Sequence, residues 1–106
     1  MKKPTINTDL RIVDQSRTMS AFEVDFACQE ARITIHFEQT SESPSAWRVK
    51  AKGRSRVGAD PTTATSTAPT KLDALRATAA EWRSGPDDPS FDWEAMESLL
   101  NTVRAL

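Results

Sequence analysis

The sequence predicts an α+β fold: a three-stranded antiparallel meander followed by two helices packed on one face, a β-β-β-α-α two-layer sandwich. Two observations predict it. In three successive stretches of residues 20–57, apolar or small residues alternate with polar ones, which is the period of a half-buried β-strand. In the last third, apolar residues recur at the three- and four-residue spacing of amphipathic helices. Strands that precede helices in this way are typical of one sheet whose apolar face is covered by helices.

The first two strands are expected at residues 20–28 and 31–38, joined by a turn at 29–30. Pairing Phe26 with Ile33 sets every inward apolar side chain opposite another, so a slip of one residue would destroy the match. The Gln-Glu turn lacks the Asn-Gly or Asp-Gly chemistry of tight hairpins, which leaves a slightly longer turn as an alternative. The matched register therefore predicts a hairpin.

The third strand is expected at residues 47–57, where cations occupy every even position and apolar or small residues every odd one. Pairing Val49 with Phe37 extends the apolar face of the sheet and sets Arg48 opposite Glu38. The even positions would then line the solvent face of the sheet. They are the candidate binding residues Arg48, Lys50, Lys52, Arg54 and Arg56.

Two helices are expected at residues 71–84 and 91–105. Thr70 at the N-cap and Asp73 at the capping-box position mark the start of the first helix. Gly85, followed by a proline, marks its end.

The second helix is expected to be capped by Ser90 or Asp92. On an idealised helix, Phe91 and Trp93 are about 200° apart. One of the two rings is therefore expected to be exposed as a partner contact.

The remaining segments are predicted to lie outside this core. Residues 1–18 are mostly polar and are expected to form a flexible N-terminal arm, with a short extra strand at 10–13 as the alternative. Residues 19–106 would form a single α+β domain. Within it, residues 58–70 are rich in Thr, Ala and Pro and are expected to form a mobile loop.

Composition narrows the function mainly by exclusion. The chain has 106 residues, of which 38% are hydrophobic and 27% charged, as in a globular domain with a modest core. No apolar run approaches the roughly 20 residues that span a bilayer, and the N-terminus lacks the pattern of a signal peptide. The single cysteine, Cys28, allows no internal disulfide, so a cytoplasmic location is expected.

No cofactor or metal site is expected. Three glycines provide no phosphate-binding loop, and one cysteine provides no zinc motif. The acidic residues around 87–94 lack the spacing of a calcium-binding EF-hand loop, and their place at a helix start explains them more simply.

Three functional hypotheses remain. The first is a small non-enzymatic interaction module that binds a protein partner or itself, through the charged sheet face or by strand addition at an edge strand, 10–13 or 47–57. The second is a nucleic-acid-binding module that uses the cations at 48–56, with the 58–70 loop and Lys71 at its margin. A net charge of -1 and a solvent face without aromatic residues argue against it.

The third and most distant hypothesis is a small enzyme. His36, the only histidine, falls opposite Glu23 in the predicted register and near Glu38, so it could act as a general base. The predicted sheet sets no serine or cysteine nucleophile beside it, and a plain cross-strand polar pair is the simpler explanation.

Overall fold

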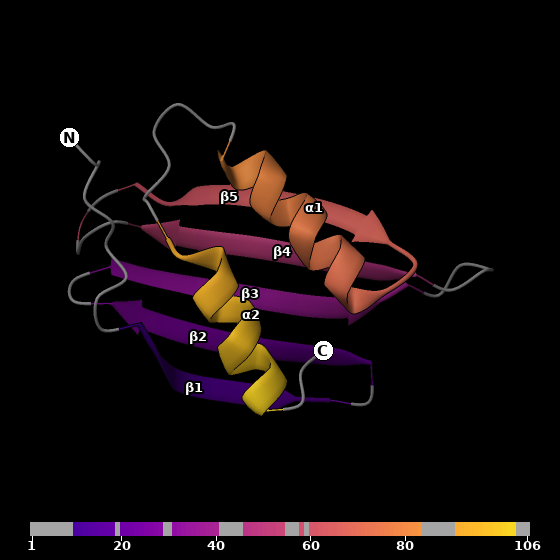
Figure 1. Ribbon diagram of the computed structural model, residues 1–106, viewed down its shortest axis with the longest axis horizontal. Helices are drawn as coiled ribbons and strands as arrows, with labels where there is room; N and C mark the ends of the chain where they lie inside the picture. Colours follow the sequence, from indigo (N-terminus) through magenta and orange to yellow (C-terminus); the bar gives the residue numbers. More distant parts are fainter. Residues whose placement is uncertain are drawn as a thin grey trace.

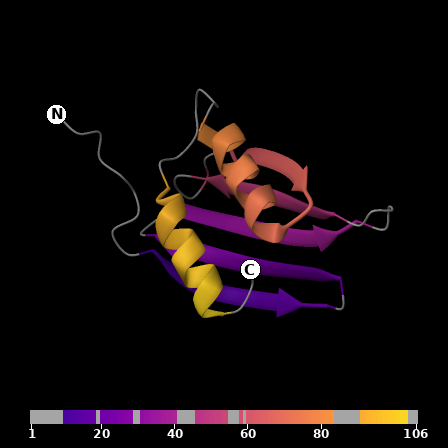
Figure 2. The same cartoon turned by 45° about the vertical axis from the view of Figure 1, so that its right-hand side comes forward.

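Five antiparallel strands form one sheet, in sequence order, and two helices follow. The computed structural model describes residues 10–18, 20–28, 31–40, 46–54, 58, 60–83 and 91–103. Its elements are β1 (Arg11–Arg17), β2 (Ala21–Cys28), β3 (Ala31–Gln39), β4 (Trp47–Arg54), β5 (Thr62–Ala68), α1 (Lys71–Arg83) and α2 (Trp93–Thr102). Both helices lie on the same side of the sheet, α1 over β4 and β5, and α2 across the half formed by β1, β2 and β3 (Figure 1, Figure 2).

The α+β class fits, but the expected three-stranded meander is wrong, because the sheet has five strands. The two additional strands come from segments expected to be an arm and a loop. β1 shifts register against β2 between Ile12 and Asp14, and this bulge disrupts the alternation that marks a strand in sequence. β5 consists only of threonine, alanine and serine. Its β-branched threonines favour a strand, but it has no large apolar side chains whose alternation would indicate a buried face.

The predicted strand registers are confirmed. Phe26 lies opposite Ile33 in the β2–β3 pair, and Phe37 lies opposite Val49 in the β3–β4 pair. β4 is described from Trp47 to Arg54, and the last three residues of the expected strand, 55–57, lie outside the described part of the chain.

Gly53 near the end of β4 allows a close approach to β3. A Cβ atom at this position would lie 2.8 Å from the carbonyl oxygen of Arg32 and 3.0 Å from Cβ of Ile33. The first distance is shorter than real Cβ contacts, and the obstacle is backbone, which cannot swing aside. The glycine therefore keeps the β3–β4 pairing regular up to Arg54, opposite Arg32.

Side-chain caps set the starts of both helices. The Thr70 hydroxyl accepts a hydrogen bond from the backbone N–H of Asp73 at 3.1 Å, as predicted. The Asp92 carboxylate accepts one from the N–H of Ala95 at 3.1 Å. The alternative cap, Ser90, lies outside the described residues. α1 runs to Arg83, and the expected last residue, Ser84, lies outside the described residues. α2 runs from Trp93 to Thr102, so it begins two residues after the expected start.

Three aromatic rings meet between the helices and the sheet. Trp82 of α1, which is 1% exposed, makes edge-to-face contacts with Phe91 and Trp93 at centroid distances of 5.8 and 5.9 Å. Phe91 and Trp93 are both buried, so the expected exposure of one ring is wrong. The helical angle between them does not apply, because α2 begins at Trp93 and Phe91 precedes it.

A buried hydroxyl ties α1 to the middle of β4. Thr78 is fully buried, and its Oγ1 lies 3.0 Å from the carbonyl oxygen of Val49 and 2.8 Å from that of Ala74, one turn earlier. The hydroxyl proton serves one of the two acceptors at a time. Because α1 is held against the inner side of β4, the opposite side of this strand stays available.

Candidate functional site

The side of the sheet turned away from the helices, here called the outer face, carries most of the charged side chains of the strands. On β4 the odd positions Val49, Ala51 and Gly53 are buried, and the even positions are exposed. The exposed side chains form what we call the cationic strip: Arg48, Lys50, Lys52 and Arg54. The predicted alternation is therefore present, while Arg56, the fifth predicted cation, lies outside the described residues.

Acidic side chains occupy the other half of the outer face. Glu23 and Asp25 project from β2, and Asp14 of β1 is paired with Asp25. β3 lies between the two halves. Its Thr34 lies opposite Asp25 of β2 on one side and opposite Lys52 of β4 on the other. With strands about 4.8 Å apart, the acidic and basic rows are separated by about 10 Å, close to the screening length at physiological salt.

The acids nearest the centre of the face have partners within the sheet. Thr34 donates a hydrogen bond to Asp25 at 2.6 Å, and His36 Nδ1 lies 3.2 Å from a carboxylate oxygen of Glu23. Both contacts follow the predicted register.

The cations of β4 are less well matched than these acids. Arg48 lies 3.7 Å from a carboxylate oxygen of Glu38, as predicted, with both side chains about half exposed. Lys50, Lys52 and Arg54 make no ion pair with any residue that the structure describes. Within the described part of the sheet, the row of cations on β4 is thus only partly matched by carboxylates.

A shallow hollow of about 430 Å³ lies at the centre of the outer face. Its lining comes from three neighbouring strands: Glu23, Thr34, His36, Glu38, Lys50 and Lys52. The hollow offers ammonium groups on its β4 side and carboxylates on its β2 and β3 sides. A ligand that enters it can place an anionic group on the lysines.

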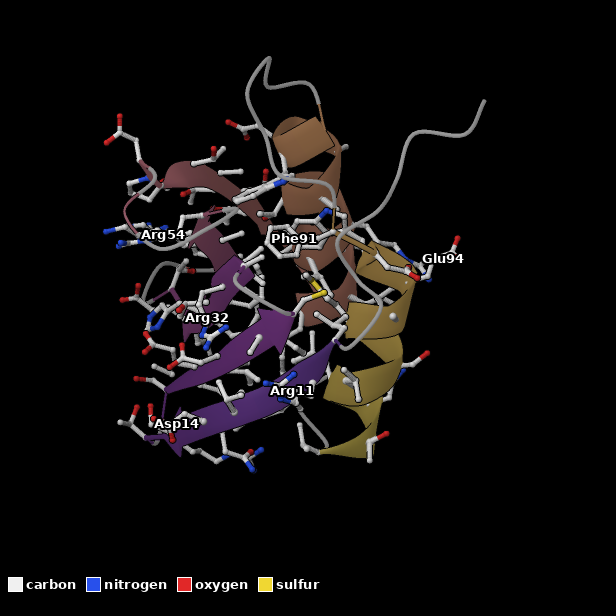
Figure 3. All side chains as sticks on the ribbon, turned by 90° about the vertical axis from the view of Figure 1, so that its left-hand side faces the viewer. Arg11, Asp14, Arg32, Arg54, Phe91 and Glu94 are labelled. Carbon is white, nitrogen blue, oxygen red and sulfur yellow. The ribbon has the colours of Figure 1, made fainter. Side chains whose placement is uncertain are left out.

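Positive charge also gathers at one end of the sheet, where β1 and β3 begin and β4 ends. Arg54 lies opposite Arg32, which lies opposite Ala27, which in turn lies opposite Arg11. Figure 3 looks at this end and shows Arg32 and Arg54 on the side of the sheet away from α2. Arg32 and Arg54 therefore place like charges directly opposite each other, as Asp14 and Asp25 do in the acidic half of the face.

Two features of the outer face were not placed from sequence. Arg11 lies in β1, where a short strand at 10–13 was expected only as the alternative, and an exposed row of threonines belongs to β5, where a loop was expected. In the β4–β5 pair these are Thr63, Thr65 and Thr67, opposite Lys52, Lys50 and Arg48. The alternation of threonine at 63, 65 and 67 with other small residues is the signal that could have identified the second strand.

The position of β4 removes one predicted binding mode. β4 pairs with β3 on one side and β5 on the other, so residues 47–54 form an internal strand. Strand addition at 47–57 is therefore wrong for this part of the segment, because its backbone groups are already paired. A ligand can reach β4 only through its side chains.

The enzyme hypothesis gains no support from the surroundings of His36. Cys28 is fully buried on the inner side of β2, and the hydroxyl of Thr34 in the hollow donates a hydrogen bond to Asp25. In the ranges covered by the structure, no group of three or more His, Cys, Asp or Glu side chains could hold a metal ion. No described helix is both long and apolar enough to cross a membrane.

No protein-family model, curated protein or solved structure matches this chain. Function is therefore inferred from the chemistry of the outer face.

Proposed function

We propose that this protein is a non-enzymatic interaction module whose cationic strip binds an acidic segment of a partner protein. The observation that carries the proposal is that three of the four described cations of the strip make no ion pair with a described residue. Asp25 and Glu23 are engaged by hydrogen-bonding side chains of β3, whereas Lys50 and Lys52 have no ion-pair partner among the described residues. An acidic partner would supply the missing charge.

The spacing of the strip suits an extended acidic peptide. Successive cations of β4 are two residues apart, which is about 6.7 Å along a strand. An extended peptide repeats its side chains on one face at the same interval, so acidic residues at alternate positions would meet successive cations. The exposed threonines of β5 border this track with hydroxyl groups that can donate hydrogen bonds to carboxylates.

A protein partner fits the outer face better than a nucleic acid does. The carboxylates of Glu23 and Asp25 lie two strands, or about 10 Å, from the strip, where they would repel a phosphate backbone that crosses the face. Described aromatic residues of the strands take inner positions; the ring of Trp47, for example, lies under the ammonium group of Lys71 at 4.8 Å. The described outer face therefore lacks the stacking platform of a single-strand binder.

A cytoplasmic location is part of the same proposal. It is supported by the buried free thiol of Cys28, since free thiols persist in reducing compartments.

The proposal predicts that the protein binds a fluorescent peptide of about eight residues, in which glutamate alternates with threonine, at low ionic strength. Fluorescence anisotropy measures the affinity at about 50 mM and about 300 mM salt, and the affinity should fall about tenfold between them. A single-stranded DNA oligonucleotide of similar charge should bind no more tightly than the peptide. Absence of peptide binding at low salt would refute the proposal, and tighter binding of the oligonucleotide would favour the nucleic-acid hypothesis instead.

A further inference from the structure

β5 is an edge strand of the described sheet, and its own residues show none of the usual protection against pairing with another strand. It pairs with β4 on one side, and its other side presents backbone N–H and C=O groups beyond the described sheet. The seven residues Thr62–Ala68 include no charge, proline or glycine, and the strand pairs with β4 without a register shift. Natural sheets usually block such an edge with charges, prolines or bulges.

The opposite edge of the same sheet is protected. β1 carries the charged residues Arg11, Asp14 and Arg17, and it has a bulge between Ile12 and Asp14. Both features discourage another strand from pairing there. The contrast within one sheet indicates that β5 is free to take a partner strand and β1 is not.

We propose that two copies of this chain associate through β5, which pairs antiparallel with the β5 of the second copy to form a continuous ten-stranded sheet. The argument for a second copy is the near-palindrome of the strand, Thr-Thr-Ala-Thr-Ser-Thr-Ala. With Thr65 on the two-fold axis, Thr65 faces its own copy, Thr63 faces Thr67 and Ala64 faces Ser66. Threonines then meet threonines on the outer face, and small residues meet on the inner face.

The helix layer is compatible with this pairing. α1 lies over β4 and β5, so the α1 helices of two paired copies would lie about 10 Å apart, the usual distance between packed helices. Glu81 of α1 stands beside the edge, since its carboxylate accepts a hydrogen bond from Ser66 at 3.4 Å. Ala77, one turn earlier, is exposed on the same side of α1, and its small side chain leaves room for the second helix.

The response to salt distinguishes this dimer from one that is held together by opposite charges. β5 has no charged residue, so the strand pairing itself contributes no ion pair to the interface. Added salt has no attraction between charges of the paired strands to screen, so the dimer should hold as salt rises. If the acidic half of one outer face instead bound the cationic strip of a second copy, the dimer would weaken as salt rises.

The experiment is sedimentation equilibrium of the purified full chain over about 5–500 µM, a range suited to a small interface. We expect a monomer–dimer equilibrium for the wild type, and Thr65→Glu should raise the dimer dissociation constant about tenfold or more. In the Thr65→Glu variant, the new carboxylate lies opposite Lys50 of its own chain, which favours the fold of the monomer. In the dimer it would lie opposite the same carboxylate of the second copy, and the two like charges would repel each other.

The matched control is Ser16→Lys on the other edge strand, where the new cation faces Glu23 within its own chain. It should leave the dimer unchanged, and mixing Thr65→Glu with Thr65→Lys chains should restore association. A wild type that stays monomeric at the highest concentration would overturn the proposal, and it is also the result expected if β5 pairs with another protein. Equal effects of Thr65→Glu and Ser16→Lys, or a dimer that weakens with salt, would overturn it too.

Discussion

Replacing Trp82 with alanine is expected to lower the free energy of unfolding by about 3–5 kcal/mol. Trp82 is 1% exposed and joins α1 to the start of α2 through its contacts with Phe91 and Trp93. Truncation would remove the indole ring from the middle of this cluster and leave a cavity that the rigid neighbours cannot close. Since domains of this size are stable by only about 5–15 kcal/mol, the loss is a large share of the total.

Urea unfolding followed by far-ultraviolet circular dichroism measures this loss without relying on tryptophan fluorescence. Trp47→Ala is the matched control, because Trp47 is only partly buried and its ring is covered by the Lys71 ammonium group. It should cost about 1–2 kcal/mol. Trp82→Phe keeps an aromatic ring in the site, so its loss of unfolding free energy should fall between those of Trp47→Ala and Trp82→Ala. An equal loss for Trp47→Ala and Trp82→Ala would show that the aromatic cluster does not hold the layers together.

Reversing the charge of both central lysines, in the double variant Lys50→Glu and Lys52→Glu, is expected to weaken binding of the acidic peptide about 10- to 100-fold. Each exposed charge pair contributes up to about 1 kcal/mol, and reversal turns two attractions into repulsions. The fold should survive, because neither lysine makes an ion pair with a described residue and both are exposed. Fluorescence anisotropy at low salt measures the change.

The control for net charge is Lys71→Glu with Arg76→Glu on α1, on the helix side of the sheet. It changes the total charge by the same amount, at the expense of the Arg76–Glu97 ion pair and of the contact between Lys71 and Trp47. Peptide affinity should fall by less than about threefold, since these groups lie across the sheet from the strip. Comparable losses in the two double variants would mean that the peptide responds to overall charge and not to the outer face.

The middle of the sheet could be predicted because large apolar side chains alternate there with polar ones. Phe26, Ile33, Phe37 and Val49 admit one register that buries them together, and the structure has that register. The outer strands could not be predicted in the same way. Val13 on β1 is 49% exposed beside the bulge, and β5 buries Ala64 rather than a large side chain. Hydrogen bonding to an existing sheet edge, which no local pattern reveals, holds these strands in place.

The same difference between the middle and the outer strands explains which parts of the candidate site could be predicted from the sequence. The exposed cations from Arg48 to Arg54 follow from the alternation of β4 alone. Their surroundings depend on β5, so Thr65 could not be placed beside them beforehand. The internal position of β4 followed only from the pairing of β5, and it changed the expected mode of binding from strand addition to contact through side chains.

A titration of the isotopically labelled protein with the acidic peptide, followed by amide nitrogen–proton correlation spectra, tests binding at the cationic strip most directly. The largest shift changes should fall on Lys50 and Lys52 of β4 and on their cross-strand neighbours His36 and Thr65. The amides of α2 should stay in place. Changes that are centred on the helices, or spread evenly over the chain, would contradict a binding site on the outer face.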